Sequence, residues 1–453
     1  MTNNRLIPFV LCLLPMLCGA QERNISLQEC LDASHSSNPD VLNAGLDVRA
    51  ARAQKQEASV NWFPTVSATA VGFHALNPLL TIGLGDVLGG SDAANNLRYS
   101  LETTAVMNGI NTEWSALNYG YLGAVTVTQP LFAGGRIANG NRLAALGVKA
   151  ADVKKEMALR DNDEAIVRKY WLAVSLSAKK QALQQGIDLV RSLEKDVAAA
   201  YEAGLAKESD LLQVRLKAKD LDATMIKLRS GEKLAKMDLF NASGMEYSVL
   251  GLDGMVLADG FGSLEAPRNY YMDESEVAGA MSESRLLEMN VESKKLEKMM
   301  TLGEGLPQVA LGASMGYGQV IGNPQANGLA YAVIRIPISD WGKTARRLQR
   351  NQYEIDKAEN EKAFLDKQLV LKVSKDWVEL QSAWDGMLSA EDALTLSELM
   401  ATQKREEYEA GLCTMSELLQ FQTELQSARS SYVDSQAAYC NALSVWKGES
   451  GIN

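Results

Sequence analysis

The five-residue stretch Tyr-Glu-Ala-Gly-Leu occupies positions 201–205 and occurs again at 408–412. The similarity continues beyond it, because Ser-Asp-Leu-Leu-Gln at 209–213 corresponds to Ser-Glu-Leu-Leu-Gln at 416–420. Both pairs are separated by the same offset (408 − 201 = 207 and 416 − 209 = 207). Other landmarks keep this offset, namely Pro130 with Pro337, Gly135 with Gly342 and Gly244 with Gly451. A constant offset over so long a stretch predicts that the chain is an internal duplication.

The first copy carries an insertion that the second copy lacks. Phe63-Pro64 resembles Leu306-Pro307, and this pair is offset by 243 residues (307 − 64 = 243), which exceeds 207 by 36. The excess falls between residues 74 and 120, a stretch rich in Gly, Asn, Ser and Asp. This composition predicts a long loop.

The duplication and the amino terminus together predict the domain organisation. Residues 1–20 have the features of an export signal, with Arg5, an apolar stretch at 6–17 and a small-residue cleavage site at 18–20. The bulky Leu17 argues against lipidation of Cys18. We expect a first structural repeat at 21–244, a linker at 245–272 and a second repeat at 273–453. Cleavage leaves Cys30, Cys413 and Cys440, a number too small and odd for a disulfide framework.

Within each repeat, the hydrophobic pattern changes from strand-like to helical. Residues 136–200 contain no proline, and a helix of this length measures roughly 100 Å at about 1.5 Å per residue, too long for the interior of a compact domain. Apolar residues within it and in the next helix are spaced alternately three and four apart, as in a coiled-coil seam. The seam residues are Leu143, Leu146, Ala150, Val153 and Met157, then Leu211, Val214, Ala218, Leu221, Met225 and Leu228, and in the second copy Leu418, Phe421, Leu425, Ala428 and Tyr432. In the first copy we expect a helix at 27–59 with a pause at Asn38-Pro39, strands about 64–74 and 121–132, and helices 136–200 and 205–240. In the second copy we expect strands about 307–317 and 329–338 and helices 343–407 and 412–447.

The expected strands alternate between two kinds of side chain. Val125 and Val127 fall on one face, whereas Thr126 and Thr128 fall on the other, and Arg335 falls on the threonine face under the 207 offset. Four strands cannot close a barrel, and open strand edges are not tolerated in lipid. If the strands cross a membrane, two or three chains must therefore share one barrel of eight or twelve strands. Thr126, Thr128 and Arg335 are then the candidate pore lining.

The sequence resembles the TolC family of outer-membrane efflux proteins. The resemblance covers essentially the whole mature chain, and it is carried by Thr-Gln-Pro-Leu-Phe-Ala-Gly-Gly at 128–135, by the two Tyr-Glu-Ala-Gly-Leu stretches and by the duplication. It implies a mainly α fold with a small β part. Long antiparallel helical hairpins would form an α-helical barrel in the periplasm, and four strands per chain would contribute to a shared 12-stranded transmembrane β-barrel in outer-membrane lipid. The implied assembly is a homotrimer that works as an exit duct with a periplasmic adaptor protein and an inner-membrane pump.

The resemblance also assigns positions at the periplasmic tip. It implies that Asp210, Glu417 and Tyr408 lie at the entrance, and that the tip turns that contact the adaptor include Tyr201, Gly204, Leu205, Gly411 and Leu412. Cys413 stands where a basic partner is expected and Gln420 where a second acid is expected, so the ionic links of that family's gate are in doubt here. A simpler interpretation of Asp210 and Glu417 is that acids in the first turn of a helix complement its dipole.

Other functional classes find little support in the sequence. The net charge of −11 gives no basic surplus for binding nucleic acid. The two histidines, His35 and His74, are far apart, and no His, Cys or Glu pair has metal-ligand spacing. We therefore expect no catalytic residue, no cofactor and no metal. The main alternative is an exported coiled-coil envelope scaffold or surface structural protein, which would share the helical seams and the export signal.

Overall fold

The computed structural model describes residues 23–452 except 111, 117–118 and 320–322. The expected export signal at 1–20 therefore lies outside the described residues. The chain divides into two compact units. Of the described residues, the helical unit comprises 23–49, 150–288 and 360–452, and the sheet unit lies within 50–149 and 289–359. The protein is mainly helical with a smaller strand part, so the expected fold class is confirmed at this level.

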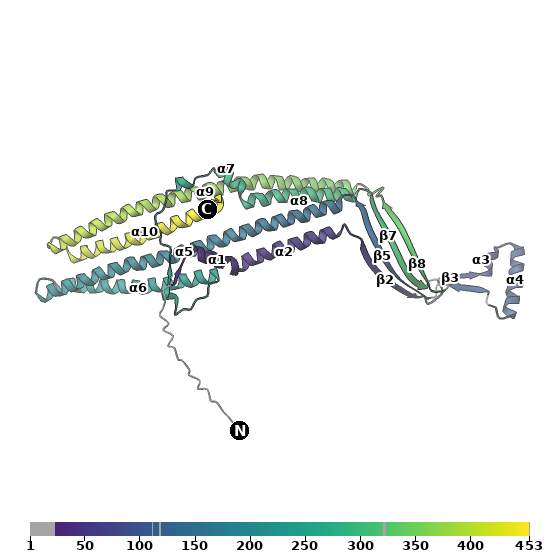
Figure 1. Ribbon diagram of the computed structural model, residues 1–453, viewed down its shortest axis with the longest axis horizontal. Helices are drawn as coiled ribbons and strands as arrows, with labels where there is room; N and C mark the ends of the chain where they lie inside the picture. The colour runs from purple at the N-terminus through teal and green to yellow at the C-terminus, as the bar shows by residue number, and fades with distance from the viewer. Residues whose placement is uncertain (1–22, 111, 117–118, 320–322, 453) are drawn as a thin grey trace, which may run out of the picture. The chain divides into compact units, whose positions relative to one another are not determined.

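Four long helices dominate the chain. These are α5 (Arg136–Glu202), α6 (Glu208–Ser243), α9 (Lys343–Glu409) and α10 (Met415–Ser450). Helices α5 and α9 have 67 residues each, and α6 and α10 have 36 each. The starts of both pairs are 207 residues apart (343 − 136 and 415 − 208), the offset that relates the sequence landmarks. In each copy the two helices form an antiparallel hairpin (Figure 1).

The apolar seam of α6 forms a core of the helical unit. Its residues Leu211, Val214, Ala218, Leu221 and Met225 are all buried, as the spacing predicts. They pack with residues of α5 and with the first turns of α10, which supply Met415, Leu418 and Leu419. The two copies therefore share one core near the hairpin turns, and packing of this kind stabilises helices far more than intrinsic propensity does.

Short elements complete the helical unit. Helices α1 (Leu27–Ser37) and α7 (Glu274–Ala280) lie in it, with the 3-10 turns η1 (Leu252–Gly254) and η2 (Pro267–Tyr270). Helices α2 (Pro39–Val60) and α8 (Ser282–Glu304) contribute residues to both units.

The region 245–272, expected as a linker, contains a strand. Strand β6 (Met255–Leu257) pairs in parallel with β1 (Arg23–Ile25) near the amino terminus. The Tyr170 hydroxyl supports this pair by donating to the Asp259 carboxylate at 2.9 Å. Strands of three residues have no recognisable periodicity, and the partner is remote in sequence, so only tertiary structure reveals them.

The sheet unit contains a four-stranded antiparallel sheet. Its strands are β2 (Thr65–His74), β5 (Tyr119–Ala133), β7 (Gln308–Gln319) and β8 (Gln325–Arg335), in the order β2-β5-β7-β8 (Figure 1). Each copy contributes one pair of strands, and the pairing of β5 with β7 joins the copies.

The insertion of the first copy is not the simple loop that its composition predicts. It contains β3 (Leu80–Gly83), α3 (Leu84–Leu88), α4 (Asp92–Met107) and β4 (Glu113–Ala116), and β3 pairs with β4. The Ser91 hydroxyl caps α4 by accepting from the Ala94 N–H at 3.3 Å. The i, i+4 spacing of Leu97 and Leu101 is the helical signal that the Gly- and Asn-rich composition obscured.

Several element boundaries differ from the expected ones by a few residues, among them the start of β8 at Gln325 and not at 329. Strand β8 ends at Arg335 and not at 338, because its partner β7 begins at Gln308, the residue paired with Arg335. Helices α6 and α10 begin three residues later than expected. Each hairpin turn uses the residues after its glycine to reverse the chain before the next helix starts.

Two glycines allow a close approach within the sheet unit. Gly134, in the turn before α5, has φ of 64°, and Gly303 lies near the end of α8. A Cβ atom added to Gly303 would lie 2.8 Å from Cγ of Arg136 and closer still to the carbonyl oxygen of Gly134. Only glycine on both sides permits this contact, because real Cβ atoms do not approach other atoms so closely.

We predict that Gly303→Ala destabilises the protein by roughly 1–3 kcal/mol, because the added methyl group overpacks this contact. Gly147→Ala in α5 is the matched control, since nothing lies within 4 Å of its added Cβ. That substitution should stabilise the helix by roughly 0.5–1 kcal/mol. Denaturant unfolding of both variants measures the difference, and equal stabilities would contradict the close contact.

Candidate functional site: a two-faced sheet and two helix turns

One face of the four-stranded sheet is rich in small polar side chains. The register places Thr65 opposite Thr128 and Thr126 opposite Ser314, so that their side chains share this face. We call it the polar face, and it carries Thr65, Ser67, Thr69, Thr126, Thr128, Ser314, Gln325, Asn327 and Arg335. The polar face also includes apolar residues, namely Val71, Phe73, Leu122, Ala124, Ala310, Leu329, Tyr331 and Val333. It therefore offers hydrogen-bonding groups without being uniformly hydrophilic.

The opposite face is almost entirely apolar and is exposed in the chain. We call it the apolar face, and it carries Val66, Ala68, Ala70, Tyr121, Val125, Val127, Leu311, Ala313, Met315, Tyr317, Ala330, Ala332 and Ile334. Met315 is 70% exposed and Val66 is 67% exposed. Sheets in water bury their apolar face against other elements, so a face of this size requires an apolar environment from outside the chain.

The sheet also has two open edges. Within the described residues, strand β2 pairs only with β5, and β8 pairs only with β7. Each outer strand therefore presents a row of backbone N–H and C=O groups without a strand partner. Such edges are sites at which another strand can pair.

The three candidate pore residues all lie on the polar face. Thr126 and Thr128 belong to β5, and the Thr126 Oγ1 lies 3.0 Å from the Ser314 Oγ of β7. Arg335 is exposed at the last position of β8. The structure therefore gathers these residues on one surface, and their role as a pore lining stays a proposal.

The two Tyr-Glu-Ala-Gly-Leu stretches form the turns of the helical hairpins. Gly204 and Gly411 have φ of 75° and 72°, which is the left-handed conformation that ends a helix. The Gly204 N–H donates to the Tyr201 carbonyl oxygen, and in the second copy the Gly411 N–H donates to that of Tyr408, both at 2.9 Å. The next residues, Leu205 and Leu412, are 85% and 78% exposed. Each turn thus presents a large apolar side chain at its tip.

Tyr408 and Asp210 lie close enough to interact although they come from different copies. Tyr408 packs against the core that α6 and α10 share. Burial raises the pKa of the Tyr408 hydroxyl, and the negative charge of Asp210 raises that pKa further. The structure therefore brings together two of the three residues assigned to the entrance.

Glu417 performs the structural task that its position in the helix suggests. Its Oε2 accepts hydrogen bonds from the Thr414 backbone N–H at 2.8 Å and from the Thr414 Oγ1 at 2.9 Å. In return the Glu417 N–H donates to the Thr414 Oγ1, which completes a capping box at the start of α10. The hydrogen bonds from Thr414 lower the pKa of the Glu417 carboxyl. A helix cap leaves the carboxylate charged, so capping is compatible with the position at the entrance that the family resemblance implies for Glu417.

The two residues that depart from the family pattern make ordinary contacts. The Cys413 Sγ donates to the Lys404 carbonyl oxygen at 3.4 Å, and the Gln420 Nε2 donates to the Glu424 Oε1 at 3.0 Å. Lys404 pairs with Glu407 at 2.5 Å. The Lys404 charge near this turn is therefore paired with a carboxylate of the same helix, α9.

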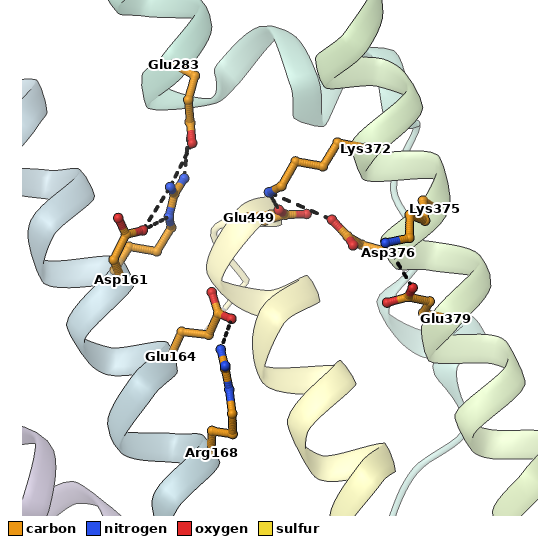
Figure 2. A network of polar contacts seen from close by, with 10 residues as sticks. Asp161, Glu164, Arg168, Glu283, Lys372, Lys375, Asp376, Glu379 and Glu449 are labelled. Carbon is orange, nitrogen blue, oxygen red and sulfur yellow. Dashed lines mark hydrogen bonds and ion pairs between the residues drawn. The ribbon is translucent and has the colours of Figure 1, made fainter.

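A polar network between helices was not predicted from the sequence. Arg160 of α5 donates two hydrogen bonds to the carboxylate of Glu283 of α8, at 2.7 and 3.1 Å, and Glu283 is labelled in Figure 2. Lys372 of α9 pairs with Glu449 of α10, whose side chain is almost fully buried. Burial and the neighbouring Asp376 raise the pKa of Glu449. Single charged residues on long helices give no sequence signal for such contacts, because the partners are up to 123 residues apart.

The described part of the chain was expected to bind no metal, and its cysteines and acidic residues are arranged as follows. The cysteines Cys30, Cys413 and Cys440 are free, and Cys30 and Cys440 are buried. No group of His, Cys, Asp and Glu among the described residues could hold a metal ion. None of the described helices combines the length and the apolar composition needed to cross a membrane.

The capping box yields a test that uses the duplication as its control. Thr414→Ala should destabilise the start of α10 by about 1 kcal/mol, because it removes the cap. Lys207 holds the equivalent N-cap position of α6 and makes no side-chain cap, so Lys207→Ala should change stability little. Thermal unfolding compares the two variants, and an equal loss in both would argue against the cap.

Comparisons with known proteins agree with this architecture. No family model matches the sequence, and no curated protein matches it. Solved structures do match. The CmeC outer-membrane channel of Campylobacter jejuni has a TM-score of 0.72 at 13% identity, covering 94% of this chain and 85% of that one. The outer-membrane protein VceC of Vibrio cholerae has 0.71 at 12% identity, covering 94% and 96%. The open MtrE outer-membrane channel of Neisseria gonorrhoeae has 0.67 at 15% identity, covering 94% and 88%. The chain therefore has the fold of the TolC-family outer-membrane channels, the fold that the resemblance in its sequence implies.

Proposed function

We propose that the protein is the subunit of an outer-membrane channel that provides an exit duct for efflux or secretion. The observation that carries this proposal is the four-stranded sheet, which has an exposed apolar face, a polar face and two open edges. A lipid bilayer covers an apolar face of this kind, and a water-filled pore suits the polar one. The similarity to solved outer-membrane channels supports the same conclusion.

The open edges point to a closed barrel built from several copies. In the antiparallel sheet, β2 and β8 run in opposite directions, so β8 of one copy can pair with β2 of the next in the same antiparallel pattern. Lipid offers no hydrogen bonds to free edges, so closure is required in a membrane. Three copies of the four-stranded sheet give twelve strands, in line with the family resemblance. The proposed assembly is therefore a homotrimer in the outer membrane with its helices in the periplasm.

The helix turns are the proposed site of contact with the adaptor and the inner-membrane pump. Leu205 and Leu412 are exposed apolar residues at the tips of the hairpins, and Tyr201 is also exposed. Exposed apolar side chains of this kind are common at protein contacts. The two repeats, at 21–244 and 273–453, would present one such turn each.

A coiled-coil envelope scaffold is the second candidate function. It would account for the helical seams and the long hairpins. It gives no reason for an exposed apolar sheet face opposite a face that carries polar side chains on strands from both copies. A pore accounts for these two faces, because one face of its wall contacts lipid and the other contacts water.

We predict that the purified protein produces discrete conductance steps in a planar lipid bilayer. Ser314→Arg, which places a cation on the polar face, should insert normally but alter the size or the ion selectivity of these steps. Ala313→Arg, the adjacent residue on the apolar face, should prevent insertion, because a cation facing the lipid costs about 2–4 kcal/mol at the middle of the bilayer.

The pair Ala313 and Ser314 serves as its own control, since the same side chain is added at neighbouring positions. A protein that gives no conductance is a scaffold and not a channel. Conductance that Ala313→Arg alters and Ser314→Arg leaves unchanged would mean that the two faces are assigned the wrong way round.

A second prediction concerns the proposed entrance. Three copies of Asp210 and Glu417 around one axis would attract cations, as acidic rings do in other pores. The double variant Asp210→Asn with Glu417→Gln removes the charges, and glutamine at 417 can keep the capping box. We expect weaker cation selectivity and a smaller fall of conductance on acidification. Because the hydrogen bonds from Thr414 lower the pKa of Glu417, its charge persists below the usual pH range, so its share of the fall should come at lower pH than for an ordinary glutamate.

The control removes two acids from the same helices away from the turns. Asp238→Asn in α6 and Asp434→Asn in α10 neutralise partners of Lys169 and Lys179. This control should leave the reversal potential and the acid response unchanged. If the double variant at 210 and 417 behaves like the control, these acids only serve the starts of their helices.

A further inference from the structure

The segment that follows β8 exposes three large apolar side chains in a row of six residues. Ile336, Ile338 and Trp341 are 59%, 95% and 97% exposed. Ile334 lies on the apolar face, and Ile336 and Ile338 follow it at every second position, so they continue the sequence pattern of that face. No strand of the described residues pairs with this segment, because β7 begins opposite Arg335.

Trp341 adopts a backbone conformation that a bulky residue rarely takes. Its φ is 55°, and it has the only positive φ of a non-glycine residue in the described part of the chain. Under the 207 offset (341 − 207 = 134), the first copy has Gly134 at this position, with φ of 64°. A strained bulky residue where the sister copy uses glycine points to a function for the side chain.

The turn itself is held by bonds that do not involve the indole. The Asp340 carboxylate accepts from the Gly342 N–H at 3.0 Å and from the Thr344 N–H at 2.7 Å. The Lys343 N–H donates to the Asp340 carbonyl oxygen at 3.0 Å. These bonds fix the backbone, and the Trp341 side chain projects from it almost fully exposed. Its contribution must therefore come from contacts outside the chain.

Three exposed cations follow directly on α9. Lys343, Arg346 and Arg350 are spaced three and four residues apart, so they share one side of the helix. The structure shows no ion pair between any of them and the described residues, whereas the nearby Arg347 pairs with Glu304. Asp340 is the only acidic residue between positions 336 and 350, so the side chains around Trp341 carry a net positive charge.

We propose that Ile336, Ile338 and Trp341, together with Lys343, Arg346 and Arg350, form a binding site for an anionic phospholipid at the membrane surface. The isoleucines contact acyl chains, the indole lies at the level of the head groups, and the cations bind the phosphate diester and the net negative charge of the lipid. The site rests on the proposed function, because the apolar face must adjoin the acyl chains. On that function, the lipid belongs to the periplasmic leaflet.

A neighbouring copy of the chain is the other possible cover for Trp341. In the proposed barrel, the start of β2 from the next copy lies beside the end of β8. That strand and the residues before it carry no Asp or Glu between positions 58 and 74. A second copy therefore offers no charge complementary to the three cations, whereas an anionic head group does.

The experiment measures which lipid contacts Trp341. The full-length protein is reconstituted in phosphatidylcholine vesicles that contain an equal fraction of brominated phosphatidylcholine or brominated phosphatidylglycerol. The protein has seven tryptophans, so the difference between the wild type and Trp341→Phe isolates the signal of Trp341. We expect this signal to be quenched by both lipids and at least about twofold more strongly by phosphatidylglycerol, since each cation near a membrane surface favours anionic lipid. Trp341→Gly, which suits the left-handed turn, replaces Trp341→Phe if the latter does not fold.

Charge variants assign the preference to this site. The triple variant Lys343→Gln, Arg346→Gln and Arg350→Gln should keep the quenching but make the two lipids equal. The control triple Lys357→Gln, Lys367→Gln and Lys375→Gln, on the same helix, should keep the preference. The proposal is overturned if Trp341 is not quenched, if the wild type shows no preference for phosphatidylglycerol, or if the control triple also loses this preference. Conductance of the same vesicles separates the two proposals, because conductance without lipid preference refutes only the lipid site.

Discussion

The free backbone groups at the two edges of the four-stranded sheet are the constraint on which the rest of the architecture depends. Strands β2 and β8 each use one side for pairing within the chain, and the apolar face between them is exposed. In water such a sheet would aggregate, and in lipid its edges would lack hydrogen bonds. Both difficulties disappear when the sheet closes with copies of itself inside a membrane. On the proposed function, the sheet of one chain is therefore one part of a barrel wall that further copies complete.

The helical hairpins follow a different physical rule, in which the turn and the core cooperate. Gly204 and Gly411 end the long helices in the left-handed conformation, and the following helices begin with contacts to one shared core. Because α10 contributes Met415, Leu418 and Leu419 to the core of the first hairpin, the two copies bury apolar side chains together near the hairpin turns. The two copies therefore stabilise each other in this region. Leucines at the turn tips remain exposed, which leaves apolar surface for a partner.

Charged residues between the helices add specificity to this packing. Arg160 and Glu283 join α5 to α8, and Lys372 and Glu449 join α9 to α10. Partly buried pairs of this kind gain little net stability, because desolvation of the buried group offsets the attraction. Their directional hydrogen bonds can instead fix which helix faces meet. Long helices with regular seams need such contacts to fix their register, because the seam alone permits one helix to slide along another by a heptad.

The sequence by itself determined the helices, the duplication and the alternation of the strands. Periodic apolar residues such as Leu211 and Val214 indicate their own burial, and the offset of 207 indicates two similar hairpins, because these signals are local or repeated. The sequence also placed Thr126, Thr128 and Arg335 on one side of the strands before their partners were known. Only the tertiary structure decided which strands pair, that β8 stops at Arg335, that β1 and β6 join, and that the inserted segment contains a helix. It also decided that Glu417 caps its helix and that Trp341 stands strained and exposed. These features depend on contacts between residues that are distant in the chain or on single backbone angles, and neither leaves a periodic signal in the sequence.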